Sequence, residues 1–209
     1  MQKTKQAFYN KYLNFVYNGV LKKAPVQVTL FITSRCNIRC KMCFYWEPVE
    51  NKSTHEISLN EIEKISKSLP NFFWLLIGGG EIFVRKDLPE IIKTFYKNNN
   101  IKHVSIPTNA TYEDKIISSL EDILSSCPDL FLNLNLSLNG LGKDHDDLCQ
   151  SDGVFEKFLS TYKKVCNLKK KYKNLGLGLN VTHSKFSENK LNNIVDYAVN
   201  NLTGIDNIS

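Results

Sequence analysis

The chain has 209 residues, of which 42% are hydrophobic and 23% are charged, and its formal net charge is +6. This length suits one large domain, and the composition is ordinary for a globular protein. No run approaches the roughly 18 apolar residues of a membrane span, and the positive charge is too moderate and too dispersed to favour nucleic-acid binding.

The first 24 residues are predicted to form an N-terminal helical extension, separate from a core domain over residues 25–209. Apolar residues recur through residues 7–23 with lysines around them, which indicates an amphipathic helix. Such a helix could dock on a membrane surface. We favour the interpretation that it packs against the core domain or plugs it.

An apolar stretch over residues 26–33 predicts a strand, and three cysteines follow it: Cys36, Cys40 and Cys43. Thiolates gathered this closely are metal ligands more often than packing residues. Structural zinc normally closes its tetrahedron with four protein ligands, whereas iron–sulfur clusters are held by cysteine thiolates. Three thiolates leave one position open, so the loop predicts a metal centre at which a small molecule can bind.

Other interpretations of the cysteines are weaker. Two of them could form a zinc knuckle with His55. Independent burial is disfavoured because Arg35, Arg39 and Lys41 are interleaved with them, and a disulfide is disfavoured because no apolar signal segment is seen. The remaining cysteines are isolated along the chain, and we interpret them as ordinary buried or half-buried thiols. They are Cys127, Cys149 and Cys166.

Helices and strands alternate after this loop. Ser58-Leu-Asn-Glu61 is typical of a capping box before a helix. The apolar run 73–77 predicts a strand, and Asp87 is expected to cap the next helix, with Pro89 in its first turn. Arg85 and Asp87 are expected to tie the loop to this helix, although Arg85 could instead reach a substrate anion. Apolar spacing predicts the remaining elements. The strands are expected at 104–106, 131–138, 177–181 and 204–209, and the helices around 116–123, 155–165 and 191–202.

Strands separated by helix-length segments pair in parallel with right-handed crossovers, which fits either a doubly wound sheet or a β/α barrel. In the segment 131–138, leucines point one way and Asn133, Asn135 and Ser137 the other. A parallel sheet covered on both faces would be apolar on both. The polar face therefore predicts a wet, ligand-lined barrel lumen, and the alternative is an asparagine ladder that satisfies itself.

Unusual loops follow the next three strands. Gly78-Gly79-Gly80-Glu81 offers backbone that a ligand can approach with no Cβ in the way, followed by a carboxylate that can pair with an ammonium. Pro107–Ala110 and Ser137–Gly140 are the other two, for which ordinary turn chemistry is the alternative. Barrel enzymes build their sites at the C-terminal ends of strands. The run Asp144–Asp147 is interpreted as a solvated loop or helix start.

The spacing C-x3-C-x2-C, with Gly-Gly-Glu one strand later, resembles the radical S-adenosylmethionine (radical SAM) superfamily, in particular its MoaA/SPASM-type branch. The resemblance extends from residue 26 to about residue 190 and includes elements similar to T-N-G at Thr108 and to S-x-D-G at Ser137. It implies an α/β fold, a partial (β/α)6 TIM-like barrel of parallel strands. Because the sequence stops where a sixth strand begins, we expect C-terminal truncation, without the branch's auxiliary-cluster region.

The resemblance also implies cofactors and their binding residues. A [4Fe-4S] cluster would be held by Cys36, Cys40 and Cys43, with its fourth iron chelating S-adenosylmethionine. Eight further residues would bind that cofactor: Met42 through its backbone, Gly79, Gly80, Glu81, Thr108, Asn109, Ser137 and Asn180. No catalytic acid or base is identifiable.

The implied activity is a radical reaction. An electron from the reduced cluster cleaves S-adenosylmethionine to methionine and a 5′-deoxyadenosyl radical, which abstracts hydrogen from an unidentified peptide or small metabolite. The expected partner is an electron donor of the flavodoxin or ferredoxin type, in the cytoplasm, with no nucleic acid or membrane. The alternative is a non-enzymatic zinc-binding or nucleic-acid-binding module that uses the three-cysteine loop. A nucleotide-binding P-loop is disfavoured because residues 78–81 lack its Lys-Ser/Thr.

Overall fold

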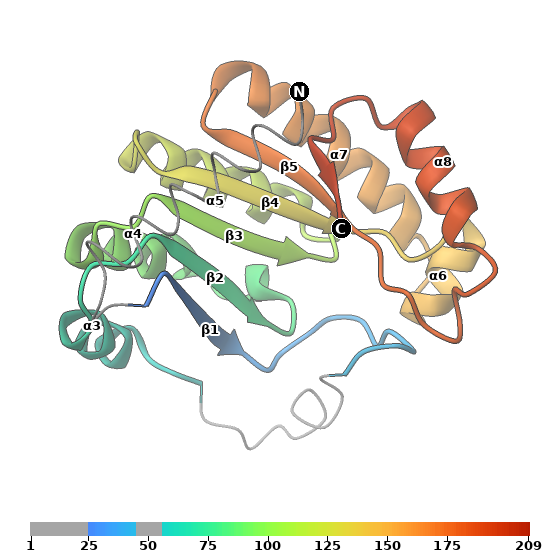
Figure 1. The fold of residues 1–209 in the computed structure, drawn as a ribbon. Coiled ribbons are helices and arrows are strands. Elements are labelled where there is room, and N and C mark those ends of the chain that lie inside the picture. Colours follow the sequence, from blue (N-terminus) through green and yellow to red (C-terminus); the bar gives the residue numbers. More distant parts are fainter. Residues whose placement is uncertain (1–24, 45–55) are drawn as a thin grey trace.

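The computed structural model describes residues 25–44 and 56–209 (Figure 1). The predicted N-terminal extension, residues 1–24, and His55 lie outside these residues, so the division at residue 24 stays a prediction. Within the described residues, no helix is both long enough and apolar enough to cross a bilayer.

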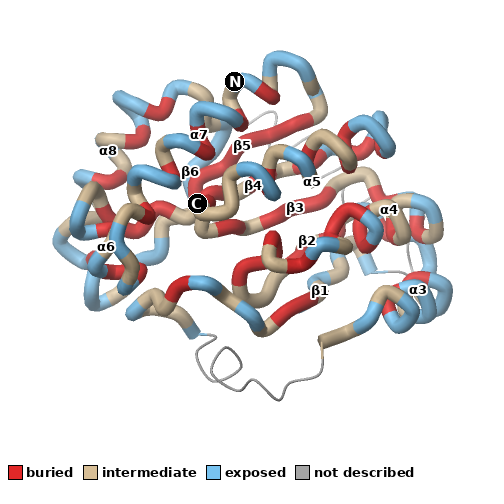
Figure 2. The backbone as a smooth tube through the Cα atoms, turned by 180° about the vertical axis from the view of Figure 1, so that it is seen from behind, coloured by how far each residue is buried: buried red, intermediate tan, exposed pale blue. Residues whose placement is uncertain are grey.

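One parallel sheet organises the described chain, and its strands follow one another in sequence order from β1 to β6. The strands are β1 (Gln27–Thr33), β2 (Trp74–Gly79), β3 (His103–Thr108), β4 (Phe131–Ser137), β5 (Leu175–Asn180) and β6 (Asn207–Ile208). Helices alternate with the strands and cover one face of the sheet, as Figures 1 and 2 show from opposite sides. The predicted partial (β/α)6 barrel, open between its first and last strands, is confirmed.

The helices are amphipathic and bury their apolar stripes against the sheet. They are α3 (Leu59–Ser68), α4 (Leu88–Asn99), α5 (Glu113–Ser126), α6 (Lys143–Cys149), α7 (Val154–Lys171) and α8 (Leu191–Asn201), and a short 3-10 helix, η2 (Ile82–Val84), follows β2. The predicted capping box at α3 is confirmed: Ser58 Oγ accepts from Glu61 N at 3.3 Å, and Glu61 Oε2 accepts from Ser58 N at 2.8 Å.

The two faces of β4 differ as its alternation predicts. Leu132, Leu134 and Leu136 are fully buried in the core beneath the helices, whereas Asn133 and Asn135 are half-buried on the opposite face. Asn133 Nδ2 donates to Asn135 Oδ1 at 2.8 Å, so part of the asparagine ladder is present. Both interpretations of the polar face therefore hold in part: the asparagines pair along the strand, and Asn135 also lines a cavity.

The glycines of β5 make room for these asparagines. A Cβ on Gly176 would lie 2.7 Å from Asn133 Oδ1, and a Cβ on Gly178 would lie 2.2 Å from Asn135 Oδ1. The amide side chains of β4 thus lie across the neighbouring strand. Larger residues on β5 would displace them from the open face of the sheet.

Arg85 and Asp87 form a tie rather than a helix cap. Asp87 occupies the N-cap position of α4, as predicted, but its side chain makes no capping hydrogen bond. Its carboxylate instead pairs with Arg85 Nη2 at 2.6 Å. The buried Arg85 Nη1 also donates to the carbonyl oxygens of Ile32, at 2.8 Å, and of Ile57, at 2.6 Å. The guanidinium therefore anchors the end of β1, directly before the cysteine loop, to the segment that enters α3.

Candidate cluster and cofactor site

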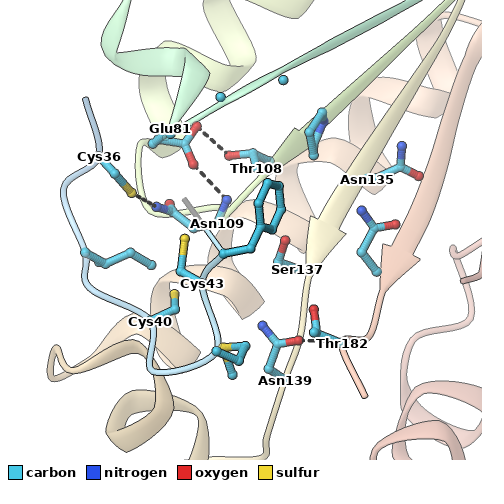
Figure 3. A pocket seen from close by; sticks show the side chains of 18 of the residues that line it. Cys36, Cys40, Cys43, Glu81, Thr108, Asn109, Asn135, Ser137, Asn139 and Thr182 are labelled. Carbon is cyan, nitrogen blue, oxygen red and sulfur yellow. Dashed lines mark hydrogen bonds between the residues drawn. The ribbon is translucent and has the colours of Figure 1, made fainter. Parts of the chain in front are cut away.

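The loops that follow β1 to β5 enclose one cavity of about 430 Å³ at the C-terminal edge of the sheet (Figure 3). Its wall contains all three cysteines of the first loop and all eight residues assigned to cofactor binding. These are Cys36, Cys40, Cys43, Met42, Gly79, Gly80, Glu81, Thr108, Asn109, Ser137 and Asn180. Residues spread along much of the sequence thus face one space.

The cysteine loop is braced by its own backbone and by Arg39. Cys43 N donates to Cys40 O at 3.0 Å, and Arg39 Nη1 donates to the carbonyl oxygens of Cys36, at 2.9 Å, and of Ile38, at 3.0 Å. Burial raises the pKa of the Cys36 thiol. A hydrogen bond with Cys149, together with burial, raises the pKa of Cys40. These two thiols therefore stay protonated until a metal stabilises their thiolates.

The three thiols suit a multi-iron cluster. Over residues 25–44 and 56–209, no three histidine, cysteine, aspartate or glutamate side chains converge on a single-ion site. A four-iron cluster is held by cysteine thiolates on separate irons, so it needs three sulfurs around one space rather than around one point. Cys36, Cys40 and Cys43 border the same cavity and are free of disulfides, and this donor set fits such a cluster.

The glycines at the end of β2 are required by the close approach of two backbone segments. Gly79 has a φ of +134°, and a Cβ on it would lie 2.2 Å from Thr33 O. A Cβ on Gly80 would lie 2.2 Å from Arg35 O. The two loops are joined where Gly80 N donates to Thr33 O at 2.9 Å and Glu81 N donates to Arg35 O at 2.9 Å. The sequence predicted that these glycines expose backbone to a ligand. The structure gives them a second role, because they allow the cysteine loop to pack closely against the loop after β2.

The buried side chain of Glu81 accepts hydrogen bonds from the loops that follow β2 and β3. It is only 1% exposed. Its Oε1 accepts from Phe83 N at 3.2 Å and from Thr108 Oγ1 at 2.9 Å, and its Oε2 accepts from Asn109 N at 2.8 Å. Burial raises the pKa of Glu81 to about 7, although these hydrogen bonds act in the opposite direction. Its predicted pairing with an ammonium group stays a prediction.

The raised pKa of Glu81 makes stability depend on pH. Its ordinary value is 4.5 and its folded value about 7, so the folded chain binds more protons than the unfolded chain between these pH values. The Glu81 contribution to stability is therefore full below pH 4.5 and declines as pH rises through 7, by on the order of 3 kcal/mol in total. Urea unfolding from pH 4.5 to 8 should show this decline in wild type relative to Glu81→Gln, which cannot titrate.

Glu90→Gln is a suitable control for this measurement, because Glu90 lies exposed on α4. Its stability curve should run parallel to that of the wild type. If wild type and Glu81→Gln lose stability in parallel over this pH range, the assigned burial of Glu81 is wrong.

Asn109 joins the third loop to the cysteine loop. Its Nδ2 lies 4.0 Å from Cys36 Sγ (Figure 3). The same Nδ2 donates to Asn37 Oδ1 at 2.9 Å. Its Oδ1 accepts from Thr111 N at 3.0 Å, which is an Asx turn. The turn chemistry considered as the alternative for this loop is thus present. It also orients the amide group toward the cysteines.

Ser137 and Asn180 are register partners at the ends of β4 and β5. Both are half-buried and line the cavity. Just beyond them, Asn139 Oδ1 accepts from Thr182 N at 2.9 Å, and this bond joins the fourth and fifth loops (Figure 3). The polar wall opposite the cysteines is therefore built from hydroxyl and amide groups.

The sequence analysis missed His145 and Cys149 as members of the site. The run Asp144–Asp147 lies at the start of α6, and Asp144 and Asp147 are exposed as expected, but His145 is only 1% exposed. Burial lowers the pKa of His145 to about 4. Cys149 is a buried thiol, as expected, but both side chains also line the cavity. Their four-residue spacing, which places them on one face of a helix, was the available signal.

Comparisons with known proteins agree with this architecture. A family model described as "Radical SAM superfamily" matches residues 30–190. A protein of Methanococcus maripaludis named "Probable GTP 3′,8-cyclase" is 38% identical over 95 residues, covering 44% of this chain and 31% of that protein. A "GTP 3′,8-cyclase" of Clostridium botulinum is 28% identical over 140 residues, covering 66% of this chain and 42% of that protein. The chain thus spans less than half the length of these curated relatives.

A solved structure titled "Native anSMEcpe with bound AdoMet and Kp18Cys peptide" superimposes with a TM-score of 0.60. Its sequence identity to this chain is 20%, and the match covers 87% of this chain and 50% of the other. At that identity the likeness shows the fold alone. Radical SAM enzymes use a [4Fe-4S] cluster and S-adenosylmethionine. Because the family model covers most of the sequence, the chain belongs to the radical SAM superfamily.

Proposed function

We propose that this chain is the core of an enzyme that reductively cleaves S-adenosylmethionine and directs the resulting radical at a substrate in its polar lumen. The observation that carries the proposal is the single cavity at the ends of β1 to β5, which brings three cysteines, a glycine-lined edge and a wall of amide and hydroxyl groups together. The cysteines follow β1, the glycines lie at the end of β2, and the amide and hydroxyl groups lie at the ends of β3, β4 and β5.

In this proposal Cys36, Cys40 and Cys43 hold the cluster through their thiolates. When bound, a [4Fe-4S] cluster supplies the electron that cleaves S-adenosylmethionine to methionine and a 5′-deoxyadenosyl radical. Met42 and the glycine edge offer backbone groups to the methionyl end of the cofactor. Glu81, which is buried between loops, orients Thr108 and Asn109 through its hydrogen bonds.

Ser137 and Asn180 face the cavity from the opposite wall, so we propose that they bind the adenosine end of the cofactor. Asn135 lies two residues before Ser137, on the same face of β4 but further from the C-terminal end of the strand. Its amide group both donates and accepts, which suits a polar substrate held behind the cofactor.

The substrate is proposed only as a class. The curated relatives are named for a reaction of GTP, and the solved neighbour was captured with a peptide. A nucleoside triphosphate and a cysteine-containing peptide are therefore the two substrates to assay first. Each should be scored by whether it accelerates the release of 5′-deoxyadenosine.

A small electron-transfer protein of the flavodoxin or ferredoxin type is the proposed electron donor. All three cysteines are partly exposed and line the cavity, so a partner could approach a cluster held there. We propose a cytoplasmic location for the chain, because thiols persist in reduced form in that compartment.

Anaerobic reconstitution of the chain with iron and sulfide tests this function. The expected product is a brown protein with roughly four irons per chain, which releases methionine and 5′-deoxyadenosine from S-adenosylmethionine when dithionite is added. The competing zinc module would instead bind stoichiometric zinc and take up no iron under the same reducing conditions. That result, with no 5′-deoxyadenosine released, would overturn the proposal.

A further inference from the structure

The cysteine loop docks on the C-terminal end of α6. Arg39 N donates to Cys149 O at 3.2 Å, and Lys41 N donates to Leu148 O at 2.8 Å. These two backbone bonds lie on either side of Cys40. They hold the middle cysteine of the loop against the last turn of α6, toward which the loop runs in Figure 1.

The side chains of Cys40 and Cys149 are also in contact. Cys40 packs against a small apolar cluster formed by Ile38, Cys149 and Val154, and its interaction with Cys149 raises the pKa of the Cys40 thiol. Cys149 is 2% exposed. Its thiol is therefore shielded from water while it touches one of the three sulfurs assigned to the metal.

The hydrogen bonds of His145 determine whether the Cys149 sulfur accepts or donates toward the imidazole. The His145 Nδ1 accepts a hydrogen bond from Asn139 N at 3.2 Å, and a neutral imidazole that accepts at Nδ1 carries its proton on Nε2. That Nε2 lies 3.7 Å from Cys149 Sγ, so its N–H points at the sulfur. In the metal-free chain the raised pKa of Cys40 keeps a proton on that sulfur. Once Cys40 is a metal-bound thiolate it can only accept, and the Cys149 S–H, whose sulfur already accepts from His145, is the group that can donate to it.

We propose that Cys149 is a positioning residue that donates a hydrogen bond to the Cys40 sulfur and raises the reduction potential of the cluster bound there. The inference rests on the proposed function. A reduced cluster carries one more negative charge than an oxidised one, and hydrogen bonds to its sulfurs stabilise that charge. The chain Asn139, His145, Cys149 and Cys40 thus connects the loop after β4 to the metal site.

The test compares the midpoint potentials of reconstituted wild type, Cys149→Ala and Cys149→Ser by EPR-monitored reductive titration without S-adenosylmethionine. Loss of the donor in Cys149→Ala should reduce the equilibrium constant for cluster reduction roughly tenfold, which lowers the potential by about 59 mV for a one-electron couple. Cys149→Ser keeps a donor in place and should restore most of that difference. Cys166→Ala removes a half-buried thiol outside the cavity wall and should leave the potential unchanged.

Two outcomes would overturn this inference while leaving the proposed function standing. One is an equal potential for wild type, Cys149→Ala and Cys149→Ser. The other is a cluster spectrum that S-adenosylmethionine shifts only after Cys149 is removed, since Cys149 would then be a ligand of the open iron rather than a hydrogen-bond donor. A wild-type chain that takes up no cluster at all would instead reject both proposals.

Discussion

Replacing Cys36 with alanine is expected to abolish the release of 5′-deoxyadenosine by the reconstituted chain. The Cys36 sulfur borders the cavity and lies 4.0 Å from Asn109 Nδ2. Without it, the proposed cluster keeps only two protein thiolates and is lost or loses its geometry. Iron and sulfide per chain should fall together with the product, which should drop to the level of a reaction without protein.

The control for Cys36→Ala is again Cys166→Ala, because it removes a partly exposed thiol from α7. It should keep wild-type iron content and wild-type cleavage. Cleavage of S-adenosylmethionine by Cys36→Ala at the wild-type rate would show that the three-cysteine loop does not hold the reactive centre.

Gly79→Ala is expected to produce the largest loss of folding stability among single methyl additions at the site. A φ of +134° is a conformation that side chains rarely adopt, and the new Cβ would lie 2.2 Å from Thr33 O. The backbone conformation alone costs about 1–3 kcal/mol. Because the overlap is with backbone, the loop after β2 must also move away from β1. We expect a total loss of roughly 4 kcal/mol or more, measured by urea unfolding of the metal-free chain.

Gly142→Ala separates the two causes of the stability loss, which are the backbone conformation and the overlap of the new Cβ with backbone. Gly142 also has a positive φ, of +53°, but a Cβ there would meet nothing within 4 Å. It should lose only the cost of the backbone conformation, about 1–3 kcal/mol. Equal losses for Gly79→Ala and Gly142→Ala would mean that the close approach of the two loops is absent in solution.

Local patterns in the sequence predicted the elements and the edge of the sheet where the site lies. The Ser58–Glu61 capping box and the alternation of leucine and asparagine along β4 each depend on neighbours within a few residues, so they could be read directly. The order of the loops then followed from parallel pairing, because the C-terminal ends of parallel strands share one edge of the sheet.

Contacts between segments that are distant in the sequence could not be predicted from local patterns. Glu81 was expected to face a ligand, and its burial beneath Thr108 and Asn109 depends on where the loop after β3 folds. The pairing of Arg85 with Asp87 was expected, but the carbonyl groups of Ile32 and Ile57 that hold Arg85 belong to distant segments, and the side chain of Asp87 makes no cap to α4. Cys149 appeared isolated in the sequence because its neighbour Cys40 belongs to a different loop.

The docking of the cysteine loop on α6 has a consequence for the order of biogenesis. The three ligands Cys36, Cys40 and Cys43 are synthesised early, but the carbonyl groups that hold the loop belong to Leu148 and Cys149. Domains form as the chain leaves the ribosome from its N-terminal end. A nascent chain that has only reached α5 therefore carries its thiols without the surface that arranges them. The docked arrangement of the cysteine loop therefore forms only after α6 has been synthesised and folded.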